Sequence, residues 1–112
     1  MNDLSKLMQL NGALAAFCFN DRGELAEHNI AEGSNLDAEV LDLLAHVLVA
    51  NTAIATMQAR GWEKTTGQSG FYPIEGFTMI GFDWSAVARG NCGVVLQNDQ
   101  ADYEAAFDAL SA

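Results

Sequence analysis

The chain has 112 residues and a mass of 12.0 kDa, the size of a single domain. Fifteen acidic residues against five basic ones give a formal net charge of −10, a surface that repels phosphate and argues against nucleic-acid binding. Half of the residues are hydrophobic, which argues against intrinsic disorder. No linker or low-complexity segment divides residues 1–112, so we expect one domain.

We predict the cellular location from the lack of a signal-like segment and of a long apolar run in the sequence. The N-terminal residues do not form a basic stretch followed by an apolar one, so no secretory signal is expected. The longest near-continuous apolar runs, residues 13–19 and 43–50, are far shorter than the roughly 20 residues that span a bilayer. Small secreted domains usually carry more than two cysteines. We therefore expect a cytoplasmic protein without membrane insertion.

The first elements are predicted to be a short helix and a hairpin. Residues 3–10 favour a helix that ends at Asn11-Gly12. Residues 13–19 are apolar at every position, which predicts a central strand covered by helices on both faces. After a turn at Gly23, residues 24–30 alternate as expected for an outer strand with one wet face.

Residues 36–60 are predicted to form the longest helix, with Ser34 as candidate N-cap and Gly61 as the residue that ends it. Its apolar side chains cover an arc of roughly 200°, which is wider than one sheet-facing stripe needs. The apolar residues are Val40, Leu41, Leu43, Leu44, Val47, Leu48, Ile54 and Met57. The surplus arc predicts a second partner for this helix.

The second half is predicted to contain a loop, three strands and a helix. Residues 61–70 hold three glycines and no aliphatic side chain, which indicates a loop. Strands are expected at 71–82, 85–89 and 92–97, followed by a helix that starts near Asn98 or Asp99. The element order predicts an α+β domain with an antiparallel sheet between helices.

We find no complete catalytic, cofactor or metal motif. The glycine-rich segments 67–70 and 90–93 lack the spacing and the lysine of a phosphate-binding loop. His28 and His46 lie on different predicted elements and belong to no ligand motif. The carboxylates of the last helix are expected to form a solvated face. The chain is therefore predicted to have no enzymatic activity.

Several segments resemble the roadblock (dynein light chain) superfamily, whose relatives include longin and profilin-like folds. Residues 7–16, LMQLNGALAA, resemble the family's opening helix, glycine and first strand. Residues 19–25, FNDRGEL, resemble its acidic turn and second strand. Residues 72–77 and 90–95 look more like a bacterial branch of small roadblock-like proteins.

The resemblance implies a five-stranded sheet of order 2-1-5-4-3 with helices on both faces. It also implies a non-enzymatic homodimer that acts as an adaptor or as a regulator of a Ras-like small GTPase. Such dimers form through the long helix and the third strand. The implied interface residues are Val40, Leu41, Leu44, Val47, Leu48, Ile54, Phe71, Tyr72 and Ile74.

The implied sheet order makes Cys18 and Cys92 residues of neighbouring strands. A disulfide would need their Cα atoms within about 7 Å and a matching register. Two buried thiols that act as small hydrophobic side chains are the favoured interpretation, and a redox pair is the alternative. We expect both thiols to stay reduced in cells.

Six aromatic residues gather between positions 62 and 84, and core or dimer packing is the favoured explanation. Trp and Tyr are also enriched where proteins bind partners. Trp62 is the best partner-binding candidate, and Trp84 is the second. The alternative function is a small-molecule- or redox-sensing domain that uses these aromatic side chains and the two cysteines.

Overall fold

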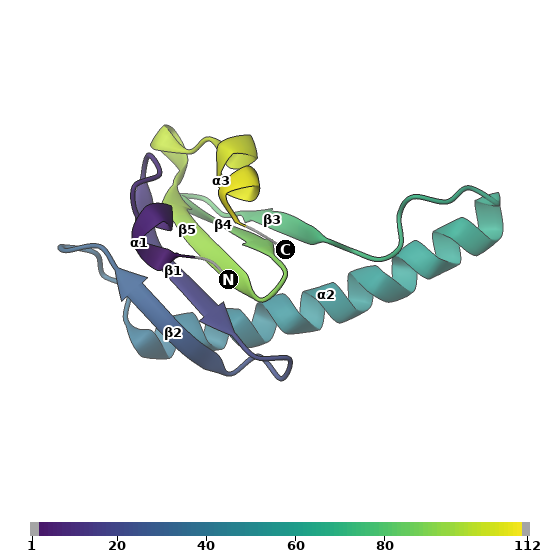
Figure 1. Cartoon of the computed structure of the whole chain (residues 1–112), viewed down its shortest axis with the longest axis horizontal. Helices are drawn as coiled ribbons and strands as arrows, with labels where there is room; N and C mark the ends of the chain where they lie inside the picture. The colour runs from purple at the N-terminus through teal and green to yellow at the C-terminus, as the bar shows by residue number, and fades with distance from the viewer. Residues whose placement is uncertain (1–2, 111–112) are drawn as a thin grey trace.

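The structure, a computed structural model, describes residues 3–110 (Figure 1). The helices are α1 (Leu4–Leu7), α2 (Ala38–Thr66) and α3 (Tyr103–Ala109), with a short 3₁₀ turn at Asn98–Gln100. The strands are β1 (Ala13–Phe19), β2 (Leu25–Ile30), β3 (Gly76–Ile80), β4 (Trp84–Arg89) and β5 (Cys92–Gln97). The predicted element order is confirmed. The last helix begins later than predicted, because the 3₁₀ turn precedes it and Asp102 caps it.

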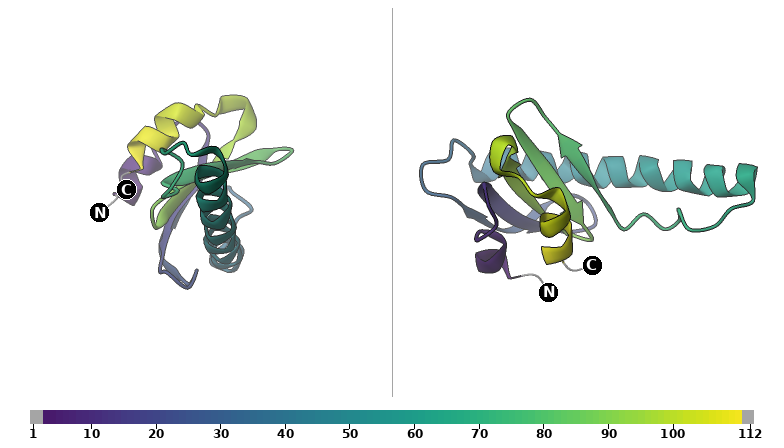
Figure 2. Two further views of the ribbon diagram at one scale, coloured as in Figure 1. Left: turned by 90° about the vertical axis from the view of Figure 1, so that its right-hand side faces the viewer. Right: turned by 90° about the horizontal axis from the view of Figure 1, so that it is seen from above.

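The five strands form one antiparallel sheet in the order β2-β1-β5-β4-β3, as the resemblance implies. Helix α2 covers one face, and α1 and α3 cover the other (Figure 2). The central strand β1 is buried from Ala15 to Phe19, as its continuous apolar sequence predicts. The fold is therefore a sheet between two helical layers.

Alternate side chains of β1 enter two separate cores. Ala15, Phe17 and Phe19 pack on the side of α2 with the helix residues Leu41 and Leu48. On the other side, a second core is built around α1 and α3. Its fully buried side chains include Leu7, Val87, Val94, Leu96 and Leu110.

The boundaries of α2 differ from the prediction at both ends. Asp37, not Ser34, is the N-cap, and its carboxylate accepts a hydrogen bond from the Val40 amide at 2.9 Å. The helix continues through Gly61, which is exposed, and ends at Gly67 with φ of 73°. A single glycine inside a helix costs only about 1 kcal/mol, and Glu63 and Lys64 after Gly61 are good helix formers. Residues 61–66 are therefore helix and not loop.

The segment from Gly67 to Glu75, here called the strap, runs back from the end of α2 to the sheet (Figure 1). The prediction placed the third strand from residue 71, but β3 begins only at Gly76. Pro73 lies in the strap and has no amide hydrogen to donate to a strand. The strap is therefore extended chain held against α2, outside the sheet.

Candidate interaction surface

The C-terminal half of α2 extends beyond the sheet and gives the molecule its elongated shape (Figures 1 and 2). The principal dimensions are 48 × 28 × 27 Å. Asn51, near the middle of the helix, still contacts β3, since its side-chain amide lies 3.3 Å from the sulfur of Met79. Past this point only the strap returns along the helix, so much of the helix surface has no cover from its own chain.

The apolar arc of α2 is divided into two stripes. Leu41, Leu44 and Leu48 are buried against the sheet, which differs from the expectation that they lie in a dimer interface. Their surface is already used inside the chain. The outward side chains carry the exposed apolar area instead, with Leu43 67% and Met57 74% exposed.

The outward residues repeat with alternating spacings of three and four. We call them the outer stripe: Val40, Leu43, Val47, Ala50, Ile54, Met57 and Gly61. This spacing has a mean period of about 3.5 residues, the pattern by which one helix packs along another. All seven residues are exposed in the chain. Among residues 3–110 nothing covers the outer stripe, which is therefore a preformed seam.

Trp62 and Phe71 form an apolar cluster at the projecting end of α2. Their rings meet edge to face with centroids 6.1 Å apart, and both are more than half exposed. A shallow hollow of about 280 Å³ lies beside them, lined also by Ile74. Trp62 was expected in a loop, but it lies on the helix because α2 continues past Gly61.

The strap is fastened to α2 by one carboxylate. Glu63 accepts hydrogen bonds from the backbone amides of Gly70, Phe71 and Tyr72 at 2.9, 2.8 and 2.9 Å. The Arg60 guanidinium lies over the Tyr72 ring, 4.4 Å from its centroid. The amide of Tyr72, followed by those of Phe71 and Gly70, holds the pKa of Glu63 below its ordinary value of 4.5.

We predict that Glu63→Gln loosens the strap at neutral pH. The neutral amide is a weaker acceptor for three N–H groups, so hydrogen exchange at Gly70, Phe71 and Tyr72 should become severalfold faster. The same release is expected in the unmodified chain at acid pH. Because the folded pKa is lowered, the fastening is fully present above the ordinary pKa and is lost as the pH falls through the folded value.

Glu104→Gln is the matched control, since Glu104 is exposed on α3, away from the strap. It should leave the exchange of these three amides unchanged. Equal exchange rates in Glu63→Gln and in the unmodified chain would show that the carboxylate does not hold the strap.

The sheet has a free edge along β3, the strand into which the strap leads. Among the described residues β3 has one neighbour, β4, so its other edge presents backbone donors and acceptors to solvent. Such an edge is a template for pairing with another strand. The outer stripe and the edge of β3 together provide a helical and a strand surface for a second chain.

The second partner-binding candidate, Trp84, lies elsewhere. It begins β4, after the β3–β4 turn, whereas Trp62 lies on α2 and Phe71 lies in the strap that leads into β3. Phe77 packs in the core on the α2 side. The aromatic residues therefore lie at separate places on the molecule, with Trp62 and Phe71 lining one hollow and Trp84 another.

Cys18 of β1 and Cys92 of β5 are directly opposite in the sheet and are joined in a disulfide, with their Cα atoms 4.0 Å apart. The Phe19 amide donates to the Asn91 carbonyl at 2.8 Å, so the next pair, Cys18–Cys92, is not hydrogen-bonded. Antiparallel strands approach most closely at such pairs. We expected two separate thiols, but the register of β1 and β5 brings the two sulfur atoms together and they form a disulfide.

The remaining candidates give no site. Asp42 and His46 are neighbours on α2, and the His46 Nδ1 atom lies 2.7 Å from the Asp42 carbonyl. His28 is exposed on β2. Within residues 3–110, no group of three or more His, Cys, Asp or Glu side chains is placed to hold a metal ion.

Helix α2 is long and apolar enough, by length and composition alone, to cross a membrane. A window of 18 residues has a mean hydropathy of 1.7, and 22% of it is buried. One such helix is weak evidence for a span, since helices of ordinary domains pass the same test. Here Leu41, Leu44 and Leu48 already pack on the sheet, and the outer stripe carries exposed apolar side chains.

Solved structures show the class of this fold. Gliding protein MglB from Thermus thermophilus matches with a TM-score of 0.69 and 18% identity, covering 96% of this chain and 82% of that one. A Roadblock/LC7 domain from Streptomyces avermitilis matches with a TM-score of 0.66 and 12% identity, covering 95% of this chain and 83% of that one. An MglB described as having a tetrameric arrangement matches with a TM-score of 0.67 and 17% identity, covering 96% of this chain and 87% of that one. The chain has the roadblock fold.

Comparison with curated proteins gives no match. The chain belongs to the family described as "Uncharacterized conserved protein (DUF2173)", whose model matches residues 3–112. The family match spans nearly the whole length, in agreement with the single sheet and its two helical layers.

Proposed function

We propose that this roadblock-like chain is a non-enzymatic, homodimeric protein-interaction module of the cytoplasm. The observation that carries the proposal is the outer stripe, a helical seam exposed along α2. Two copies that pair their stripes would remove large apolar side chains from water, at about 1.5–3 kcal/mol for each fully buried side chain. The description of a similar MglB as tetrameric supports self-association.

We propose an antiparallel pair of α2 helices, because the stripe has three residues on either side of Ala50 and can pair along its whole length about that residue. A two-fold axis perpendicular to the helices would place Ala50 against its own counterpart. Val47 would then face Ile54, and Leu43 would face Met57, on either side of the axis. The small side chain of Ala50 allows close approach at this crossing. The β3 edges could pair in the same dimer, which would join two sheets.

Ala50→Cys tests this arrangement by crosslinking. Under mild oxidation the variant should form a covalent dimer in high yield, since the two thiols meet at the axis. Leu43→Cys is the matched control on the same stripe, seven residues from the axis. In an antiparallel pair its two copies lie about 20 Å apart, at 1.5 Å rise per residue, and should not crosslink. Efficient crosslinking of Leu43→Cys, with or without crosslinking at position 50, would contradict the antiparallel arrangement.

We further propose that the dimer acts as an adaptor or as a regulator of a Ras-like small GTPase, which rests on the resemblance. Two of the three arginines are engaged within the chain, and the third, Arg22, is exposed and pairs with Glu24 at 2.7 Å. Arg89 is engaged with Glu75 and with the carbonyls of Phe107 and Leu110, and Arg60 stacks on Tyr72.

Capture from the native host with the unmodified chain and with Ile54→Glu as bait tests this role. Recovery of a small GTPase by the dimer-competent bait is the expected result. If the unmodified bait enriched no protein over the Ile54→Glu bait, the result would contradict the proposed role of the dimer as an adaptor or regulator.

A redox-responsive role is the second candidate, and the paired Cys18 and Cys92 favour it. A dithiol reductant would transfer two electrons and two protons, breaking the S–S bond and leaving two thiols. The pair joins β1 to β5 at the centre of the sheet, so its reduction would alter the stability of the whole domain. A host extract alkylated at once on lysis, with both thiols found modified, would contradict a disulfide in cells.

A further inference from the structure

The β3–β4 turn holds a fully exposed phenylalanine in a fixed position. Phe82 is 100% exposed, between Gly81 and Asp83. The Asn98 side-chain amide donates to the carbonyls of Gly81 and Phe82 at 2.9 and 3.2 Å. The Asn98 backbone amide donates to the Asp83 carbonyl at 3.0 Å. Asn98 thus holds three consecutive residues of the turn, Gly81, Phe82 and Asp83, through its side chain and its backbone amide.

Asn98 is itself fixed by the core. The hydroxyl of Ser85, which is fully buried, donates to the Asn98 side-chain oxygen. The Tyr103 hydroxyl lies 3.1 Å from the Ser85 hydroxyl. This network extends from α3 through β4 to the turn. A turn ordered before binding loses little entropy on association, so the exposed ring is well suited to a contact.

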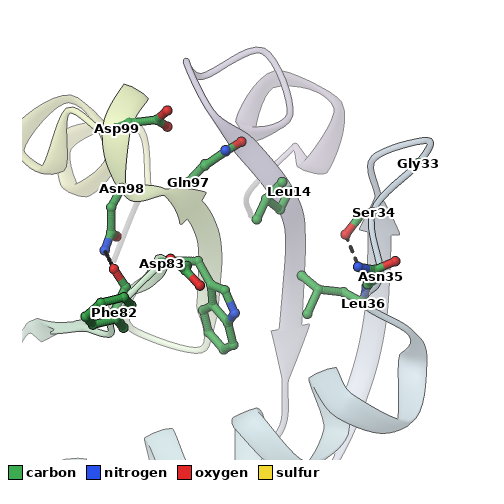
Figure 3. A pocket seen from close by; sticks show the side chains of 11 residues that line it. Leu14, Gly33, Ser34, Asn35, Leu36, Phe82, Asp83, Gln97, Asn98 and Asp99 are labelled. Atoms are coloured by element: carbon green, nitrogen blue, oxygen red, sulfur yellow. Dashed lines mark hydrogen bonds between the residues drawn. The ribbon is translucent and has the colours of Figure 1, made fainter.

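Phe82 and Trp84 form part of the wall of a groove of about 630 Å³ at the end of the sheet. Leu14 and Leu36 lie on the opposite side, and Asp99 lies at the rim near Asn98 (Figure 3). Each wall of the groove therefore carries apolar side chains next to polar ones, and the groove is open to solvent.

The groove carries negative charge without a compensating cation. Asp83 and Asp99 line it, and no Lys, Arg or His does. None of the ion pairs found within residues 3–110 involves either carboxylate. The chain as a whole is also acidic, with a net charge of −10. An acidic partner would be repelled, and a basic one attracted over a distance.

We propose that this groove binds an arginine-bearing peptide segment of a partner protein. Apolar side chains of the segment would pack between Leu14, Leu36 and Trp84. An arginine would lay its aliphatic stem along the aromatic wall and direct its guanidinium to Asp83 or Asp99. This surface differs from the outer stripe, so the inference goes beyond the proposed function and does not depend on dimerisation.

A titration followed by NMR tests the proposal on the full chain. The probe is the peptide acetyl-Leu-Arg-Leu-amide, with citrulline in place of arginine as the neutral control. The indole N–H of Trp84 and the side-chain amide of Asn98 should shift and saturate in the millimolar range. The indole N–H of Trp62, at the projecting end of α2, should not shift. The citrulline peptide should bind more weakly.

Charge variants show whether the two carboxylates provide the specificity. Asp83→Asn with Asp99→Asn should weaken binding about tenfold, because it removes both carboxylates with which the guanidinium could pair. Glu27→Gln with Asp108→Asn removes the same charge from exposed positions on β2 and α3, and should change the affinity little.

Three outcomes of the peptide titrations would overturn the proposal. These are the absence of saturable shifts at Trp84, equal binding of both peptides, and unchanged affinity in the Asp83 and Asp99 variant. A loss of self-association in Phe82→Ser would also overturn it, since a second copy would then occupy the groove. A monomeric unmodified chain that still binds the peptide would reject the proposed dimer and retain this site.

Discussion

Ile54→Glu is expected to convert the protein from a dimer of about 24 kDa, twice the chain mass of 12.0 kDa, into a monomer. Ile54 is 55% exposed in the chain and lies on the outer stripe. By symmetry, one substitution places two carboxylates in the seam. At about 2 kcal/mol or more for each unpaired charge, association should weaken by about a thousandfold or more. Light scattering after size-exclusion chromatography measures the change.

Ala105→Glu is the matched control for this experiment. It also replaces an apolar residue by glutamate, at an exposed position of α3 on the opposite layer of the fold. Its mass should equal that of the unmodified dimer. If Ile54→Glu remained dimeric while folded, the outer stripe would not be the interface.

Reduction of the Cys18–Cys92 disulfide is expected to lower the free energy of unfolding by about 2–4 kcal/mol. The bond connects residues 74 positions apart, so its loss frees a long loop in the unfolded chain. Urea unfolding with and without dithiothreitol, at one fixed protein concentration, measures the difference.

The variant with both Cys18→Ala and Cys92→Ala provides the control. It should resemble the reduced chain in stability and should not respond to dithiothreitol. An unmodified chain whose unfolding midpoint is the same in both conditions would show that the bond contributes nothing. A thiol titration of the denatured protein gives the fraction of chains that carry the bond.

Much of the fold could be predicted because local patterns and long-range packing agree in this chain. The continuous apolar sequence of β1 predicted a strand covered on both faces, and the structure confirms it. The sheet order came from the resemblance, since strand pairing cannot be derived from periodicity. The predicted end of α2 was wrong because we interpreted Gly61 as the residue that ends the helix. The helix ends instead at Gly67, which has the left-handed backbone conformation typical of a helix C-terminus.

The interaction surfaces were harder to predict, for two different reasons. Leu44 and Leu43 are adjacent in sequence, yet one is buried in the core and the other lies on the outer stripe. The three-and-four spacing of the outward residues was present in the sequence and could have separated the two stripes. The groove has no such signal. Leu14, Phe82 and Asp99 meet only because β1, β5 and β4 are neighbours in the sheet.

Sedimentation equilibrium of the unmodified chain at micromolar concentration tests the central claim most directly. We predict a single species of about 24 kDa, twice the chain mass of 12.0 kDa, because no other part of residues 3–110 covers the outer stripe of α2. A stable species of 12.0 kDa across the concentration range would contradict the dimer and the function built on it.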